Sequence, residues 1–346
     1  YNGTEGTPFT LSYDREYFLT GDGSKNPVLL TNSIWTTIST AFNSYAKNYN
    51  LDANGDGYID SITFLLCPDP ENRDVEWSSA LWAHSSQFIV SSTIVDASGK
   101  SLKLGKYNLA DATLDVYSGD TLINRDPLVD SNGIQIAESS TFVHELSHVL
   151  GLPDYYIYDT LYPDYTLSDY DEVPVGLWDL MAYNYYQMPQ HSLAYNKMLM
   201  GYIEESNVVE VTENNVYELY PTSYWEDHQI TENDVVAYYI RGQGDYTDQY
   251  FYIEYRKNYG LFDSMLPTSG LVVYRVDTNV ETLTYSGVSS GNYMAPPYNI
   301  QVMRNEVSSS SSEYLRIFGQ AYLKAYTSNE GRNYSYYNTS NKGLTC

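Results

Sequence analysis

Two of the five histidines in this 346-residue chain lie four residues apart, in the segment TFVHELSHVLGLPD at 141–154. On an α-helix, residues four apart lie one above the other, so His144 and His148 can direct both imidazoles at one metal ion. Glu145 would lie beside that ion, where its carboxylate can accept a proton from a water molecule. The spacing predicts a zinc site that activates water, with Glu145 as general base; the alternative is a histidine pair on a solvated helix.

Two histidines leave a catalytic zinc ion one protein ligand short. Gly151 can adopt a left-handed conformation that ends the helix and turns the chain back, and Pro153 would stiffen that return. Asp154 would then reach the ion as the third ligand. The competing candidate is a glutamate on a later helix, and Glu172 is the residue at a suitable distance. Because Glu172 stands two residues before Pro174 in an acidic stretch without a helical pattern, we favour Asp154.

A second metal site is predicted in the acidic loop DANGDGYID, residues 52–60. Oxygen ligands recur there at alternate positions and Gly57 is sixth, which is the pattern by which a short loop surrounds calcium. The loop departs from a full EF-hand because Thr63 replaces the glutamate at position 12 and a strand follows where a helix should begin. The alternative is a pair of Asn-Gly and Asp-Gly turns that bind no ion. The expected calcium ligands are Asp52, Asn54, Asp56, the Tyr58 carbonyl and Asp60.

The zinc segment HELSHVLGLPDYY, followed by VGLWDLMAYN at 175–184, resembles the metzincin peptidases and, more narrowly, the immune inhibitor A family of secreted bacterial metalloproteases. That family has a zinc helix that ends in a Gly-Leu-Pro-Asp turn, and a Trp-Asp-Leu-Met segment that forms the Met-turn under the metal. Family members also have an acidic loop similar to the calcium loop proposed here. The resemblance implies zinc ligands His144, His148 and Asp154, the base Glu145 and the Met-turn residue Met181.

Further segments extend the resemblance over roughly residues 30 to 280 and leave both ends unmatched; they are LDANGDGYIDSITFLLC, LWAHSS, LAYNKMLMGYI and YFYIEYRKNYGLFDSMLPTSGLVVYRVD. One departure is the third ligand, because metzincins often use histidine where this chain has Asp154. Tyr183 resembles the tyrosine that some metzincins swing toward the metal to stabilise the oxyanion, and a tyrosine that only packs is the alternative. Of the other three histidines, we expect His84 and His191 to be structural.

The charge balance excludes several classes of partner. Eighteen Lys and Arg stand against 44 Asp and Glu, a formal net charge of −26, which repels nucleic acid and anionic membrane surfaces. Apolar runs such as ITFLLC are far shorter than the roughly 20 residues of a membrane helix. The first residue is Tyr1 rather than Met, as in a mature or shortened chain. We therefore expect a secreted or extracellular protein with no nucleic-acid partner and no membrane span. The resemblance implies a protein or peptide substrate, and we expect a monomer.

The periodicity of apolar residues predicts the elements that must position these sites. Helical spacing is present at 32–48 and 135–151, with His144 and His148 on the second helix, and SITFLLC and LWAHSSQFIV are typical of strands. Strand-like runs follow beyond about 205: VVEV, NVYELY, VVAYYI, YFYIEY and GLVVYRV. We predict an α/β (α+β) metzincin-like zinc peptidase domain over 1–205 and an all-β sandwich-like domain over 206–346.

The interpretation that unites these features is a secreted zinc-dependent endopeptidase. An extended substrate would align along the strand near LWAHSS while Glu145 serves as general base. The rival is a catalytically silent peptidase-fold protein that acts as a binding or adhesion module for cell-surface protein or glycan. Intact His144, Glu145 and His148 argue against a decayed site.

Overall fold

The structure is a computed structural model of the chain, and it divides into two compact units. The first holds residues 1–149 and 286–288, and the second holds 150–285 and 289–346. The domain boundary near residue 205 stays a prediction. The described residues are 9, 11–13, 15–18, 27–66, 83–88, 90–111, 116–118, 121–124, 128–129, 135–136, 139–156, 174–182, 189–266, 269–280, 283–285, 288–290, 292, 298–303 and 322–323.

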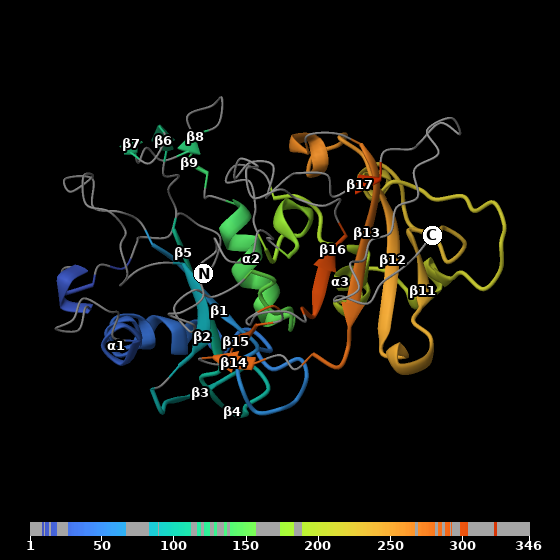
Figure 1. Ribbon diagram of the computed structural model, residues 1–346. Coiled ribbons are helices and arrows are strands. Elements are labelled where there is room, and N and C mark those ends of the chain that lie inside the picture. Colours follow the sequence, from blue (N-terminus) through green and yellow to red (C-terminus); the bar gives the residue numbers. More distant parts are fainter. Residues whose placement is uncertain are drawn as a thin grey trace. The chain divides into compact units, whose positions relative to one another are not determined.

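The first unit combines two α-helices with a small mixed sheet (Figure 1). In the described order β1-β5-β2, strand β5 pairs parallel with β1 and antiparallel with β2. Three short hairpins, β3-β4, β6-β7 and β8-β9, accompany this sheet. The elements are η1 Arg15–Phe18, α1 Pro27–Ala46, β1 Ile62–Leu66, β2 His84–Gln87, β3 Thr93–Val95, β4 Ser101–Lys103, β5 Lys106–Asp111, β6 Val116–Ser118, β7 Thr121–Asn124, β8 Leu128–Val129, β9 Gln135–Ile136 and α2 Ser139–Val149.

Strand β5 is the central strand of this sheet, and its residues 107–110 are buried. Tyr107 and Leu109 pack against Leu30 and Ile34 of α1, and α2 contacts both β5 and β2. Asn108 and Ala110, which point to the opposite face of β5, are buried as well, as expected for a strand covered on both faces. The sheet thus gives α2, the helix of the two histidines, a rigid support.

Both predicted helices are present, but their predicted beginnings were wrong. The first helix begins at Pro27 rather than at residue 32, because proline suits the first helical turn, where its missing N–H has no intrahelical partner. The second begins at Ser139 rather than 135, because Gln135 and Ile136 pair with β8 as strand β9. Strands β1 and β2 fall within the two runs predicted for them.

The second unit is built on one six-stranded sheet, in which β10, β11, β12, β13 and β16 follow one another and β17 also pairs with β13 (Figure 1). Strand β10 pairs parallel with β11, and the other neighbours are antiparallel. From residue 176 the elements are η3 Gly176–Trp178, α3 Ala194–Leu199, η4 Glu205–Asn207, β10 Val208–Glu210, η5 Thr222–Glu226, β11 Ala237–Arg241, η6 Gly244–Tyr246, β12 Gln249–Arg256, η7 Asp263–Met265, β13 Gly270–Asp277, β14 Leu283–Tyr285, β15 Val288–Ser290, β16 Ile300–Val302 and β17 Tyr322–Leu323.

Four of the five predicted C-terminal strands are confirmed, and the strand predicted for NVYELY at 215–220 was wrong. Strand β11 pairs with β10 on one side and with β12 on the other, so it offers this segment no free edge. Val216 is 91 % exposed, as expected for a segment without strand partners. A second large sheet facing the first is not found in the described part of the chain, and the sandwich stays a prediction.

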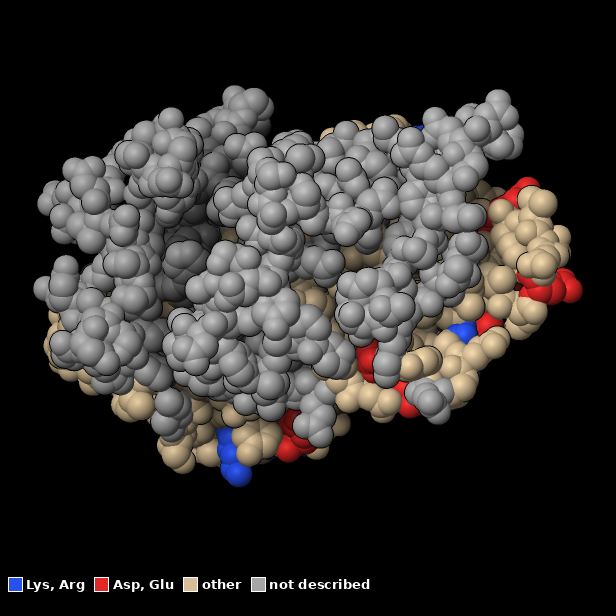
Figure 2. Space-filling model, in the orientation of Figure 1, with Lys and Arg blue, Asp and Glu red and all other residues tan. Residues whose placement is uncertain are grey.

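The fold class is mixed α and β, with few helices and several sheets, which is compatible with an α+β protein. No described helix is both long and apolar enough to cross a membrane. On the face drawn in Figure 2, most of the coloured charged side chains are acidic, in line with the net charge of −26.

Candidate metal centre

The polar side of α2 is its buried side. His144, Glu145 and His148 are each only 6 % exposed, whereas the apolar residues Leu146 and Val149 of the same helix are half-buried. Burying two imidazoles and a carboxylate on one short helix is costly unless they find partners, and such burial is typical of functional sites. Helical periodicity alone does not show which side of this helix is buried, and here the side with the two histidines is the more buried one.

The chain turns back directly after α2, as predicted. The helix ends at Val149, and Gly151 adopts a φ of +99°, a left-handed conformation that glycine reaches without a side-chain clash. Leu152 and Pro153 are then buried, and Asp154 follows with 2 % of its surface exposed. This turn brings Asp154 back to the histidines.

His144, His148 and Asp154 form a cluster in which each residue offers a ligand atom, and these atoms all lie within 4.8 Å of one another. The two imidazole rings are perpendicular, with centroids 4.9 Å apart. Among the described residues, this is the only group of three or more His, Cys, Asp or Glu that could hold a metal ion in this way. Two imidazoles and one carboxylate are the donor set of several catalytic zinc sites, so the residues fit that ion.

Glu145 lies beside this cluster. One of its carboxylate oxygens, Oε2, is 4.0 Å from Nε2 of His148. Since residue 145 is one step around the helix from residue 144, its carboxylate is adjacent to the convergent ligand atoms without being one of the three. It is placed to exchange protons with a molecule bound at the cluster.

No family model matches this sequence, and the comparison with curated proteins gives no match. The likeness to the immune inhibitor A family therefore rests on the motifs of the sequence itself.

Met181 lies next to the Asp154 segment. It is fully buried, and its carbonyl accepts a hydrogen bond of 2.8 Å from the N–H of Tyr155, the residue after Asp154. Asn292 holds the same segment, because its N–H donates to the Asp154 carbonyl at 3.2 Å and its side-chain amide donates to the Tyr155 carbonyl at 3.1 Å. Two further predicted or competing site residues, Tyr183 and Glu172, lie outside the described residues.

The acidic loop has the predicted backbone shape. Gly57 adopts a φ of +86° at the sixth position, and strand β1 follows the loop. Asp52 is buried, and its carboxylate accepts hydrogen bonds from the N–H groups of residues 55, 56 and 57 at 2.7 to 3.2 Å. Lys100 lies 3.7 Å from the same carboxylate.

The other side chains of this loop also bond to its own backbone. Asn54 Oδ1 accepts from the N–H of Asp56 at 2.9 Å, and Asp56 Oδ1 accepts from the N–H of Tyr58 at 2.8 Å. Asp60 Oδ2 accepts from the N–H of Ala53 at 2.9 Å. The loop therefore makes the local turns that its sequence favours, and its carboxylates do not form a cluster like that of the histidines.

The structural roles predicted for His84 and His191 agree with their surroundings. His84 begins β2, and its Nε2 is 2.9 Å from the Tyr107 hydroxyl. His191 lies just before α3, with Nδ1 2.9 Å from Nζ of Lys197 and Nε2 3.0 Å from Oε1 of Glu226. Burial, with Lys197 nearby, holds the pKa of His191 well below its ordinary value, so the imidazole is neutral.

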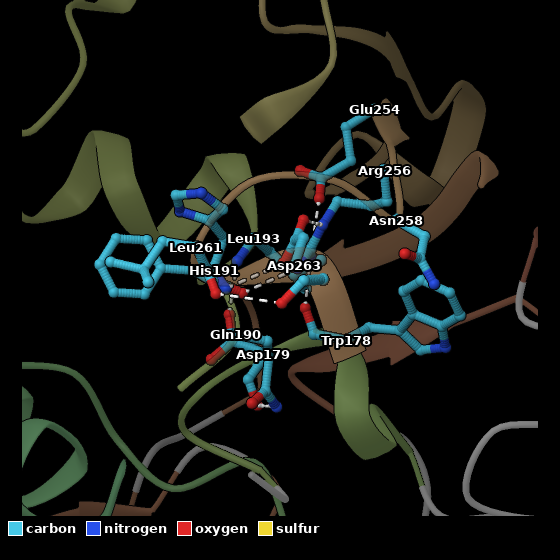
Figure 3. A network of polar contacts seen from close by, with 12 residues as sticks. Trp178, Asp179, Gln190, His191, Leu193, Glu254, Arg256, Asn258, Leu261 and Asp263 are labelled. Carbon is cyan, nitrogen blue, oxygen red and sulfur yellow. Dashed lines mark hydrogen bonds and ion pairs between the residues drawn. The ribbon is translucent and has the colours of Figure 1, made fainter. Parts of the chain in front are cut away.

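Sequence reasoning missed a buried polar network in the second unit (Figure 3). Asp179, Glu254, Arg256 and Asp263 are each 0 % exposed. A signal was available in YFYIEYRK, where Glu254 and Arg256 stand two apart and so share one face of an aromatic strand. Charged residues on the core side of a strand require partners, and these partners are distant in sequence.

Proposed function

We propose that the protein is a secreted zinc-dependent endopeptidase. The observation that carries the proposal is the buried convergence of His144, His148 and Asp154, with the Glu145 carboxylate beside them. A bound zinc ion supplies a Lewis acid that lowers the pKa of water and polarises a peptide carbonyl. With His144, His148 and Asp154 as its three protein ligands, a zinc ion would keep a fourth position for water or substrate, as catalytic rather than structural zinc sites do.

Glu145 is the residue that moves protons in this proposal. Its carboxylate accepts a proton from the water molecule that attacks the peptide carbonyl, and it then donates that proton to the leaving amine. Its position 4.0 Å from His148 keeps it near the reacting atoms without requiring it to be a ligand. His144 and His148 would offer ring nitrogens to the ion, and Asp154 would offer a carboxylate oxygen.

Strand β2 is proposed to align the substrate. It is the terminal strand of the described order β1-β5-β2, and α2 contacts it. An extended peptide can add to the edge of such a sheet through main-chain hydrogen bonds, which suits a peptidase that accepts unfolded chains. The peptide would then run beside the helix that bears the base.

Calcium bound by the loop at 52–60 is proposed as a second, structural ion. Alternating oxygen groups with glycine in the sixth position support it, together with the positive φ of Gly57. Its function would be to hold the loop that precedes β1.

The experiment that tests the proposed activity compares the unmodified protein, Glu145→Gln and a chelated sample on a denatured protein and a peptide library. Because one carboxylate serves both proton transfers, Glu145→Gln is expected to lower cleavage by about 10⁴-fold, the upper end for loss of a general acid or base. Zinc content and fold should be retained, since glutamine has nearly the same shape. Equal cleavage by Glu145→Gln would refute this mechanism, and no cleavage by zinc-loaded unmodified protein, with any activation step ruled out, would favour the silent binding protein.

A further inference from the structure

The carboxylate of Asp179 joins the Met181 turn to the segment that precedes and begins α3. Oδ1 accepts from the N–H of Met181 at 2.7 Å, and Oδ2 accepts from the N–H of Leu193 and from Nδ2 of Asn196, each at 2.7 Å. Asp179 is completely buried, and burial raises the pKa of its carboxyl while these three donors lower it. A buried carboxylate with three short hydrogen bonds fixes all the groups that donate to it.

Asn196 extends this connection to the residue beside the third ligand. Its Oδ1 accepts a hydrogen bond of 2.8 Å from the hydroxyl of Tyr155, which is 1 % exposed. The N–H of Tyr155 donates to the Met181 carbonyl at 2.8 Å. Tyr155 is thus held at its backbone by the turn and at its ring by Asn196, and Asp154 precedes it directly.

Arg256 of β12 holds both ends of the same region (Figure 3). Nη1 donates to the Trp178 carbonyl at 2.7 Å and Nη2 to the His191 carbonyl at 3.1 Å, on either side of the Met181 turn. Asp263 accepts two hydrogen bonds from the guanidinium, at 2.7 and 2.6 Å, and orients it. Through Arg256, strand β12 of the large sheet therefore holds the backbone on both sides of the Met181 turn. This fixes the turn to which the Asp179 carboxylate is bonded.

We propose that Asp179 is a positioning residue, an inference that rests on the proposed metal site. Asp179 acts through Asn196 and the Tyr155 hydroxyl to hold Asp154 where it can bind the metal. The carboxylate of Asp154 reaches the cluster from a turn, whereas the histidines are fixed by α2. A ligand on a turn loses more conformational freedom on binding unless its neighbours are already held. The hydrogen bonds from Asp179 through Asn196 to Tyr155 restrain the residue next to Asp154 in the metal-free protein.

The test measures zinc affinity by competition with a chromogenic chelator for the unmodified protein, Tyr155→Phe and Tyr238→Phe. Removing the Tyr155 hydroxyl breaks the chain with little change in volume, and loss of an outer partner of this kind typically lowers metal affinity by about 10- to 100-fold. Tyr238 is the matched control, because its buried ring also donates one hydrogen bond of 2.8 Å, to the carbonyl of Glu218 in the same unit. Unfolding of the metal-free variants by urea shows whether their stabilities are alike.

The proposal predicts a loss of zinc affinity in Tyr155→Phe that is at least tenfold larger than in Tyr238→Phe. Asp179→Asn should lower zinc affinity more than Tyr155→Phe does. The double variant should bind zinc little more weakly than Asp179→Asn alone, because both substitutions break the same chain of hydrogen bonds. Equal affinity in Tyr155→Phe and the unmodified protein, or equal losses in both tyrosine variants, would overturn the positioning role, whether or not Asp179→Asn folds. If the unmodified protein binds no zinc, the proposed function fails and this inference with it.

Discussion

The α2 cluster and the acidic loop were both predicted from ligand spacing, yet their side chains differ in what they bond to. In the loop, each acidic or amide side chain accepts a hydrogen bond from the backbone N–H of another loop residue. At the cluster, two imidazoles on a helix and one carboxylate from the following turn bring their ligand atoms together. Aspartate and asparagine have a local alternative to metal, because their short side chains can form turns by themselves.

This difference shows how far each pattern can specify a metal. Helical geometry fixes the separation of His144 and His148, and the backbone N–H groups of a helix interior are already used, so the imidazoles have no such local partner. The loop pattern is compatible with an ion and also with a turn that needs none. Experiments that separate the two regions are therefore the most informative.

The largest effect is expected for Asp154→Ala at the cluster. Removing a direct ligand should weaken zinc binding by more than the about 10- to 100-fold that loss of an outer partner costs, because two histidines alone do not complete the site. The fold should be retained, since the Tyr155 contacts with Met181 and Asn196 involve other groups. Zinc content after dialysis measures this, with Glu145→Gln as the matched carboxylate control. Unchanged zinc in Asp154→Ala would remove Asp154 from the ligand set and make Glu172 the candidate again.

A smaller effect is expected at the acidic loop. If the loop binds calcium only when folded, calcium at a hundredfold excess over its Kd should stabilise the protein by about 2.7 kcal/mol. Asp56→Ala should abolish most of that gain, so its thermal stability should fall more in calcium buffer than in calcium-free buffer.

Asp234→Ala is the control for the loop experiment. Asp234 is a turn-forming carboxylate in the second unit, and its Oδ2 accepts hydrogen bonds from the N–H and the hydroxyl of Thr231 at 2.8 and 2.7 Å. Its loss should cost the same stability with and without calcium. If Asp56→Ala behaves in the same way, the loop is a pair of turns and the calcium proposal is refuted.

The sequence predicted features that depend on local spacing. The α2 helix, its end before Gly151, strand β1 and most strands of the large sheet follow from periodicity and from turn residues. Element limits were less well predicted, because proline at the start of α1 and the pairing of Gln135 and Ile136 with β8 depend on signals that compete with periodicity.

The support of the candidate site could not be predicted, because it joins residues that are distant in sequence. Asp179 meets Asn196, Arg256 meets the carbonyl of Trp178, and Asn292 meets the Asp154 segment only after the chain has folded. Their residue types predict only that they need partners if they are buried, because buried charges and amides are costly without them. Which partners they find is decided by tertiary packing, and no spacing rule encodes it.

The most direct test of the central claim is X-ray absorption spectroscopy at the zinc edge on the zinc-loaded protein. The account predicts one zinc ion with only nitrogen and oxygen ligands at about 2.0–2.2 Å and with the outer scattering of two imidazoles. Asp154→Ala loaded with zinc should keep both imidazoles and lose one oxygen ligand or exchange it for water. A sulfur ligand, or fewer than two imidazoles in the unmodified protein, would contradict the assignment of His144 and His148 and with it the proposed peptidase site.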